Sequence, residues 1–131
     1  MDIKVQSMTI DKTNSTPYVK FDYENGCLEI RGESFPENSA KFYSPIIEQL
    51  QTALSQDENK KWKIEFEIVY FNSSTSKVFM TLFDMLDEKV LDGRDISVVW
   101  RCDKENEISI ECGEEFKEDL SNLTFTIELF E

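Results

Sequence analysis

The chain has 131 residues, 40 % of them hydrophobic and 12 % aromatic, which is enough for one domain with a real buried core. Its 27 Asp and Glu against 14 Lys and Arg give a net charge of −13, which argues against partners that need a basic surface, such as nucleic acid or an anionic membrane. Histidine is absent, so Ser-His-Asp and Cys-His catalytic sites are excluded.

The three cysteines, Cys27, Cys102 and Cys112, are odd in number and lack a metal-binding spacing. No apolar leader and no apolar run of membrane length is present, so we expect a cytoplasmic protein with reduced thiols. Phosphate-loop, dinucleotide-binding, calcium-loop and nucleophile-elbow motifs are also missing. We therefore expect neither a cofactor nor a metal, and whether the cysteines do more than pack stays open.

The predicted elements begin with a weakly alternating edge strand over residues 3–10. Apolar and charged residues then alternate on both sides of Asn25-Gly26, which predicts an antiparallel hairpin over residues 19–30. A helix follows from residue 38 or 39, where Asn38 or Ser39 can cap its first turn. Glu37 and Asn38 are also candidates for a partner surface, although we favour the capping role.

The next strand covers residues 62–71 and changes character along its length. Ile64, Phe66, Ile68 and Tyr70 share one face, and from Ile68 onward both faces are apolar. This pattern predicts a central strand whose far end is covered by helices on both sides.

A second helix is predicted from the hydroxyl residues that follow this strand to about Lys89. It has a wide apolar sector and a polar stripe of Lys77, Thr81, Asp84 and Glu88, with Met80 at the edge of the stripe. After it come a strand over residues 96–102, a third helix and a last strand over residues 124–130. In the third helix, Ile108, Cys112, Phe116 and Leu120 are expected to share the buried face.

The order of strands and helices predicts a single α/β domain over residues 1–131. Its sheet is expected to be mixed, with an N-terminal hairpin and largely parallel strands, packed with about three helices.

The segment NSSTSK, residues 72–77, places four hydroxyl residues at the junction between the buried strand and the second helix. In the simplest interpretation, Asn72 or Ser73 caps the helix and the other hydroxyls fill an exposed first turn. The alternative rests on the unpaired N–H groups and partial positive charge of a helix start, which favour a phosphate. Such a junction suits a phosphorylation switch without being specific to one.

Several motifs occur together in family order: NSTPYV (14–19), GESFPENS (32–39), FEIVYFNSSTSK (66–77) and EEFKEDL (114–120). With them the chain resembles the SiaC-like family of bacterial regulatory phosphoproteins, whose fold is similar to that of STAS domains, the anti-sigma-factor antagonists. The combination of the second and third motifs is the specific part of this resemblance, which covers nearly the whole chain.

The resemblance implies a STAS-like protein without enzymatic activity. It implies phosphorylation by a GHKL-type serine/threonine kinase, reversal by a PP2C-type phosphatase, and binding and activation of a diguanylate cyclase by the unphosphorylated form. The family's phosphoacceptor position corresponds to Ser73, where the family has Thr, and Ser74 and Thr75 stay alternatives. From their position beside the switch, and not from the resemblance, partner contacts are expected from Asn72, Lys77, Met80, Thr81, Asp84, Glu37 and Asn38, with ordinary helix surface as the alternative for the polar stripe.

Two rival functions stay open at this point. The first is an anti-sigma-factor antagonist of the STAS type that uses the same switch to sequester a GHKL-type anti-sigma kinase. The second is an enzyme with Ser73 as nucleophile, which is disfavoured because no histidine can activate it and only Lys77 is nearby in sequence as a base.

Overall fold

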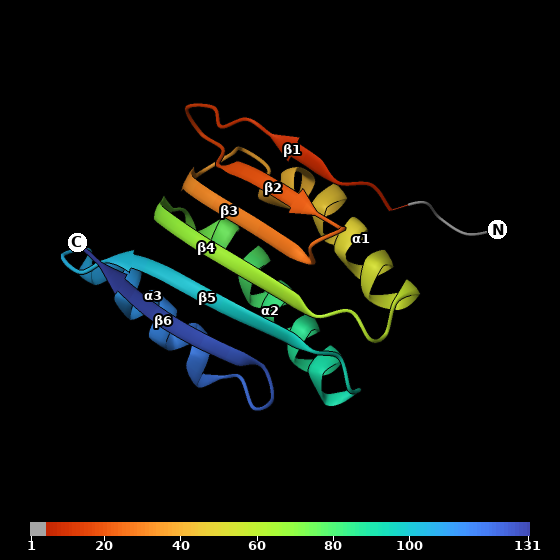
Figure 1. Cartoon of the computed structure of the whole chain (residues 1–131). Coiled ribbons are helices and arrows are strands. Elements are labelled where there is room, and N and C mark those ends of the chain that lie inside the picture. Colours follow the sequence, from red (N-terminus) through yellow and green to blue (C-terminus); the bar gives the residue numbers. More distant parts are fainter. Residues whose placement is uncertain (1–4) are drawn as a thin grey trace.

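The computed structural model describes residues 5–131, in which six strands form one sheet and three helices pack on it (Figure 1). The strands are β1 (Met8–Ile10), β2 (Tyr18–Asp22), β3 (Cys27–Ser34), β4 (Trp62–Phe71), β5 (Ile96–Asp103) and β6 (Thr124–Phe130). The helices are α1 (Ser39–Gln56), α2 (Ser73–Leu91) and α3 (Glu107–Glu118). The predicted edge strand begins later than expected, at Met8, and residues 3 and 4 lie outside the described residues.

The strands lie in chain order across the sheet, which confirms the predicted mixed topology. β1, β2 and β3 are antiparallel neighbours, whereas β3, β4, β5 and β6 are parallel. The predicted hairpin joins β2 to β3, and its turn contains Gly26 with φ of 65°. Any Cβ at this glycine would collide with the carbonyl oxygen of Lys61, so both conformation and space require glycine there.

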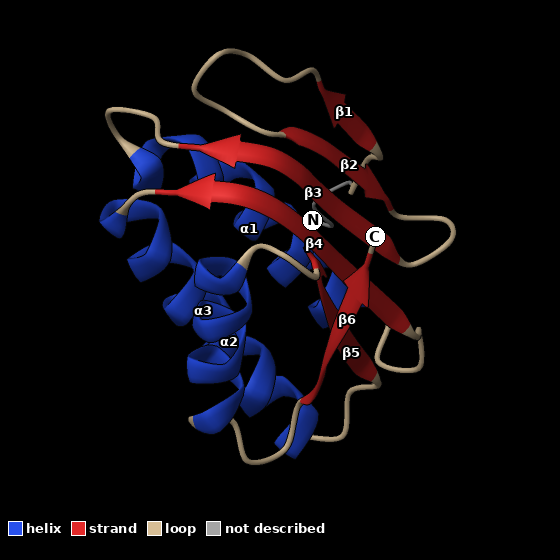
Figure 2. Cartoon of the chain, turned by 90° about the vertical axis from the view of Figure 1, so that its left-hand side faces the viewer, coloured by secondary structure: helices blue, strands red, loops and turns tan. Residues whose placement is uncertain are grey.

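All three helices cover the same face of the sheet (Figure 2). This follows from the topology. The crossovers between parallel strands are right-handed, and the strand order runs in a single direction from β3 to β6, so every helix lies on the same side of the sheet. The expectation that the end of β4 is covered on both sides is therefore wrong. Ile68 is buried beneath the helices, but Val69 is 60 % exposed and Tyr70 is 55 % exposed.

The core lies between this face and the helices, and aromatic rings fill much of it. Trp100 of β5 is fully buried, and its indole N–H donates a hydrogen bond to the carbonyl oxygen of Ser109 at 2.9 Å. α3 can approach so closely because Gly113 lies directly against the Trp100 ring. The buried face of α3 therefore consists of Ser109, Gly113 and Phe116, and the prediction that Ile108 lies on it is wrong.

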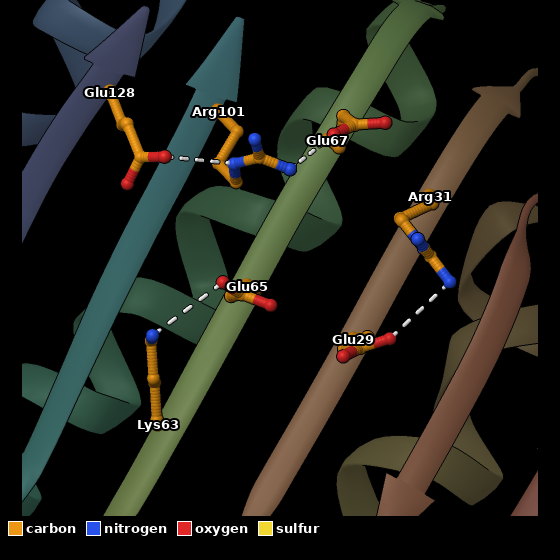
Figure 3. A network of polar contacts seen from close by, with 7 residues as sticks. All are labelled: Glu29, Arg31, Lys63, Glu65, Glu67, Arg101 and Glu128. Carbon is orange, nitrogen blue, oxygen red and sulfur yellow. Dashed lines mark hydrogen bonds and ion pairs between the residues drawn. The ribbon is translucent and has the colours of Figure 1, made fainter. Parts of the chain in front are cut away.

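The opposite face of the sheet is polar, with charged side chains on adjacent strands (Figure 3). Arg101 bridges Glu67 of β4 at 2.6 Å and Glu128 of β6 at 3.1 Å. Ion pairs of this exposed kind contribute little to stability, but they keep the uncovered face hydrophilic.

Candidate functional site

The hydroxyl junction forms the start of α2, and Asn72 is its N-cap. The side-chain oxygen of Asn72 accepts hydrogen bonds from the Thr75 N–H at 3.0 Å and from the Ser74 hydroxyl at 3.1 Å. The backbone N–H of Asn72 donates to the carbonyl oxygen of Ser34, which connects the junction to the end of β3. The capping interpretation is thus correct for Asn72, but its expectation of an exposed first turn is wrong, because Thr75 is buried.

Thr75 is the centre of a buried hydroxyl network. Its Oγ1 lies 3.0 Å from the hydroxyl of Ser34 and 2.9 Å from that of Ser39, and it donates to the Ser34 carbonyl oxygen at 3.1 Å. Ser34 also shares a hydrogen bond of 2.7 Å with the buried Tyr43 hydroxyl. The network joins the end of β3 to the starts of α1 and α2, so these three segments hold one another in position.

The hydroxyls of the junction differ sharply in accessibility. Thr75 is fully buried, and Ser74 is half-buried with its hydroxyl bonded to Ser39 at 2.8 Å. Ser76 is also half-buried, whereas Ser73 is exposed. A kinase can reach Ser73 without disturbing the network, but a phosphate on Thr75 would require the network to open.

The surroundings of Ser73 suit a phosphate group. Asn72 satisfies the N–H groups of Thr75 and Ser76, which leaves those of Ser73 and Ser74 without a partner among the described residues. No acidic residue occurs in the first turn of α2. Lys77, four residues further along, lies within reach of the same helix face. The start of α2 therefore presents two backbone N–H donors and the Lys77 side chain, which together can bind an anion beside Ser73.

The predicted polar stripe of α2 is exposed, as expected, but it borders two different depressions. Lys77 and Thr81 line a groove of about 420 Å³ between α1 and α2, whose opposite wall includes Ile47 of α1. Met80 and Asp84 line a small crevice of about 40 Å³ between α2 and α3. The stripe therefore separates the groove between α1 and α2 from the crevice between α2 and α3, and its role in partner binding stays a prediction.

Glu37 and Asn38 lie exposed beside the junction. Asn38 caps α1, because its side-chain oxygen accepts the Lys41 N–H at 3.0 Å, which confirms the favoured capping role. The next residue, Ser39, carries the hydrogen bond to Ser74, so the loop containing Glu37 lies near the start of α2. A partner on the junction could contact both.

Sequence reasoning missed the partners of Thr75. Ser34 lies in phase with Leu28 and Ile30 on the buried face of β3, where an apolar residue is normal. A hydroxyl in an inward position is a signal of a buried polar contact, but it does not identify the other members. Ser39 and Tyr43 come together with Thr75 only through the packing of α1 against α2.

A metal site, a membrane-spanning helix and a serine nucleophile are the remaining alternatives for residues 5–131. Among residues 5–131, no group of three or more His, Cys, Asp or Glu side chains is placed to hold a metal ion. No helix in the same range is long and apolar enough to cross a membrane. As for a serine nucleophile, Lys77 is exposed, whereas a lysine that serves as base is normally desolvated.

The fold and the junction define a mixed α/β protein whose distinctive feature is an Asn-capped helix start with one exposed hydroxyl. Residues 10–130 match the model of the SiaC family regulatory phosphoproteins. The chain therefore belongs to the SiaC family.

Similar proteins of known sequence and structure agree with this assignment. An uncharacterised protein of Pseudomonas aeruginosa (strain UCBPP-PA14) is 33 % identical over 117 residues, which cover 89 % of this chain and 92 % of the relative. The solved structure of SiaC of Pseudomonas aeruginosa superposes with a TM-score of 0.88 at 30 % identity, covering 95 % of this chain and 99 % of the other.

A second similar structure shows such a protein with a partner. It is that of the diguanylate cyclase SiaD in complex with its activator SiaC, from Pseudomonas aeruginosa. The matching chain has a TM-score of 0.88 and 32 % identity, with coverage of 94 % of this chain and 99 % of that one.

Proposed function

We propose that this chain is a switch protein that acts by binding, not by catalysis, and that reversible phosphorylation of Ser73 controls it. The observation that carries the proposal is the exposure of Ser73 beside unpaired N–H groups at the start of α2, while Thr75 is locked in the core. Membership of a family of regulatory phosphoproteins supports it. Ser73 is a serine where the family resemblance implies threonine, and both are substrates of the same class of kinase.

A comparison structure supports the cyclase as partner, whereas the kinase and the phosphatase are proposed from the family resemblance. Because SiaC of Pseudomonas aeruginosa is the activator of SiaD, we expect unphosphorylated Ser73 to mark the form of this chain that binds and activates a diguanylate cyclase. A GHKL-type kinase would add the phosphate and a PP2C-type phosphatase would remove it. The three free cysteines support a cytoplasmic location for this cycle.

The proposed mechanism is local. A phosphate on Ser73 adds between about one and two negative charges at a surface that otherwise presents a neutral hydroxyl. The first turn of α2 and Lys77 accommodate this charge, so the fold is kept. An effector that must dehydrate the same surface on docking is then excluded, because the phosphate resists dehydration. Contacts to the effector are proposed for Asn72, Lys77, Met80, Thr81, Asp84, Glu37 and Asn38.

Phosphopeptide mapping of protein from its own cells tests the switch. We expect a phosphate on Ser73 in part of the population, and its loss on treatment with a PP2C-type phosphatase. A phosphate found only on Ser74 or Thr75 would identify that residue, and not Ser73, as the switch. Absence of any phosphate on residues 72–77 under every growth condition would reject the proposed switch.

Variants then separate a switch residue from a contact residue. Ser73→Ala is expected to keep the fold and cyclase binding but to lose control by the kinase. Ser73→Asp should weaken cyclase binding only in part, since one charge replaces nearly two. Ser121→Ala, at an exposed loop serine, is the matched control and should behave as wild type. If Ser73→Ala fails to bind the cyclase, Ser73 is a contact and the proposed switch is wrong.

A further inference from the structure

Four exposed hydrophobic side chains gather at one corner of the molecule, and we name them the β4–α3 patch. They are Phe35, Val69, Tyr70 and Ile108, with exposed fractions of 38, 60, 55 and 75 %. Single exposed hydrophobic residues are normal on protein surfaces, but contiguous ones mark interaction sites. These are contiguous: the rings of Phe35 and Tyr70 meet edge to face at 5.8 Å, and Val69, Tyr70 and Ile108 line one cavity.

The exposure of Val69 and Tyr70 is built into the backbone. Gly32 of β3 is opposite Ile68, but Glu33 is opposite Tyr70, so Val69 is an extra residue in β4. This bulge reverses the alternation, turning Tyr70 outward and Phe71 back toward the helices.

The first turn of α3 holds the bulge in place. The Asn106 side-chain amide donates to the Val69 carbonyl oxygen at 3.1 Å, and the Ser109 hydroxyl donates to that of Ile68 at 3.2 Å. A fixed bulge at the end of a strand commonly re-aims side chains beside a functional site. The outward position of Val69 and Tyr70 is thus maintained by specific contacts from another element.

The cavity within the patch has the size of a socket for one side chain. Its volume is about 150 Å³, and Cys112 lies at its wall beside Val69 and Ile108. Small-molecule sites usually measure about 300–1,000 Å³, so a cofactor or metabolite is a poor fit. Burial raises the pKa of the Cys112 thiol, and Glu115 and Glu111 add to this, so the wall is neutral and apolar.

The rim of the patch is strongly acidic on the side of α3. This helix carries five Glu and one Lys in 12 residues, with Glu107 directly beside Ile108. A second copy of this chain would bring the same acidic helix and its own net charge of −13, so self-association is disfavoured. A partner segment with Lys or Arg around an apolar residue fits both the socket and its rim.

We propose that the β4–α3 patch extends the docking surface for the diguanylate cyclase beyond the contacts proposed around Ser73, and that the cyclase inserts there one apolar side chain flanked by basic residues. This inference rests on the proposed function and specifies its binding surface. The patch adjoins the switch, since only Phe71 and Asn72 separate Tyr70 from Ser73. A phosphate on Ser73 would border the apolar side of the contact, where docking must remove water. It would not border the α3 side, where the basic residues of the cyclase would lie.

Isothermal titration calorimetry with each purified diguanylate cyclase of the same organism tests the surface. Ile108→Glu is the main variant, because Ile108 is the most exposed member of the patch and its replacement leaves the core untouched. Leu91→Glu is the matched control, since Leu91 is 70 % exposed on a helix outside the patch. We expect Ile108→Glu to raise Kd more than about tenfold and Leu91→Glu to change it less than about twofold.

Charge reversal on the rim provides an independent readout. Glu111→Lys should weaken binding and flatten its dependence on salt concentration if the partner segment is basic. Unchanged Kd in both Ile108→Glu and Tyr70→Ser, with wild type binding, would reject the patch and leave the proposed function standing. Wild type that binds none of the cyclases would reject both. A wild-type dimer in sedimentation that Ile108→Glu dissolves would identify a second copy as the occupant and overturn the proposal.

Discussion

Helices α2 and α3 begin with the same capping arrangement, but the charge of the first helical residue differs. Each has an asparagine cap, Asn72 or Asn106, whose side-chain oxygen accepts the N–H three residues later, and in each that third residue has a buried hydroxyl, Thr75 or Ser109. The first helical residue is Glu107 in α3 and Ser73 in α2. α3 thus carries a fixed negative charge where α2 carries a hydroxyl that can acquire one.

This difference indicates how the proposed phosphorylation of Ser73 would affect the fold. Negative charge in the first turn of a helix is favourable, as Glu107 illustrates. Phosphorylated Ser73 would therefore make α2 more like α3 and would not melt it. The proposed signal would therefore be read at the surface, by a partner, and the buried hydroxyls below Ser73 keep the helix start in place.

The largest expected effects come from those buried hydroxyls. Thr75→Val keeps the shape of the side chain but deprives Ser34 and Ser39 of a hydrogen-bond partner, so unfolding free energy should fall by about 1–3 kcal/mol. Ser109→Ala removes the hydroxyl donor to the Ile68 carbonyl oxygen and should destabilise in the same range. Urea unfolding followed by circular dichroism measures both. Equal stability of Thr75→Val and wild type would show that the network does not anchor α2.

The caps come next in magnitude. Asn72→Ala and Asn106→Ala each remove the acceptor of one helix N–H and should lower the unfolding free energy by about 1 kcal/mol. Each change also removes a second bond: Asn72→Ala removes an acceptor of the Ser74 hydroxyl, which keeps Ser39 as a partner at 2.8 Å. Asn106→Ala removes the donor to the bulged Val69 carbonyl, so it should have the larger effect of the two. The same urea titrations serve as the measurement, and a larger effect of Asn72→Ala would contradict the role assigned to Asn106 in the bulge.

The helix caps and the hairpin turn could be predicted from the sequence, because both depend on residues that are close together in the chain. The Asn25-Gly26 turn, the cap at Asn38 and the start of α2 all follow from local patterns, and all are confirmed. The mixed sheet followed from the order of the elements. The family resemblance added what local pattern could not, the expectation that Ser73 is more than part of a cap.

What could not be predicted depends on contacts between distant residues. Ile64, Phe66, Ile68 and Tyr70 alternate perfectly in sequence, yet a bulge held by Asn106 and Ser109 turns Tyr70 outward. Likewise, Ile108 continues the four-residue spacing of α3, but contact between Gly113 and Trp100 rotates the buried face away from it. Both errors concern members of the β4–α3 patch, where local pattern and tertiary packing disagree.

Exchanging the first-turn charges should give a smaller effect of opposite sign in the two helices. Ser73→Glu should raise the unfolding free energy by about 0.3–1 kcal/mol at low salt, and Glu107→Gln should lower it by a similar amount. Both changes should shrink at high salt, because the interaction of charge with helix dipole is screened. Thermal unfolding at two salt concentrations provides the test. Destabilisation by Ser73→Glu would imply that phosphorylation acts by loosening α2.

The smallest expected effect concerns the link between α2 and the segment that follows α3. Asp87 of α2 accepts the N–H groups of Leu123 and Asn122, each at 2.8 Å, and these bonds lower the pKa of its carboxyl group. A carboxyl whose folded-state pKa is depressed stabilises the fold above its unfolded-state pKa of about 4 and loses that contribution as pH falls through the folded-state pKa.

Asp87→Asn should therefore be less stable than wild type at pH 7, with the difference shrinking below about pH 4. Glu88→Gln, at the adjacent exposed position, controls for loss of surface charge on the same helix. A difference between Asp87→Asn and wild type that stays constant down to pH 2 would mean that the carboxylate's charge plays no part in holding α2 to the turn before β6.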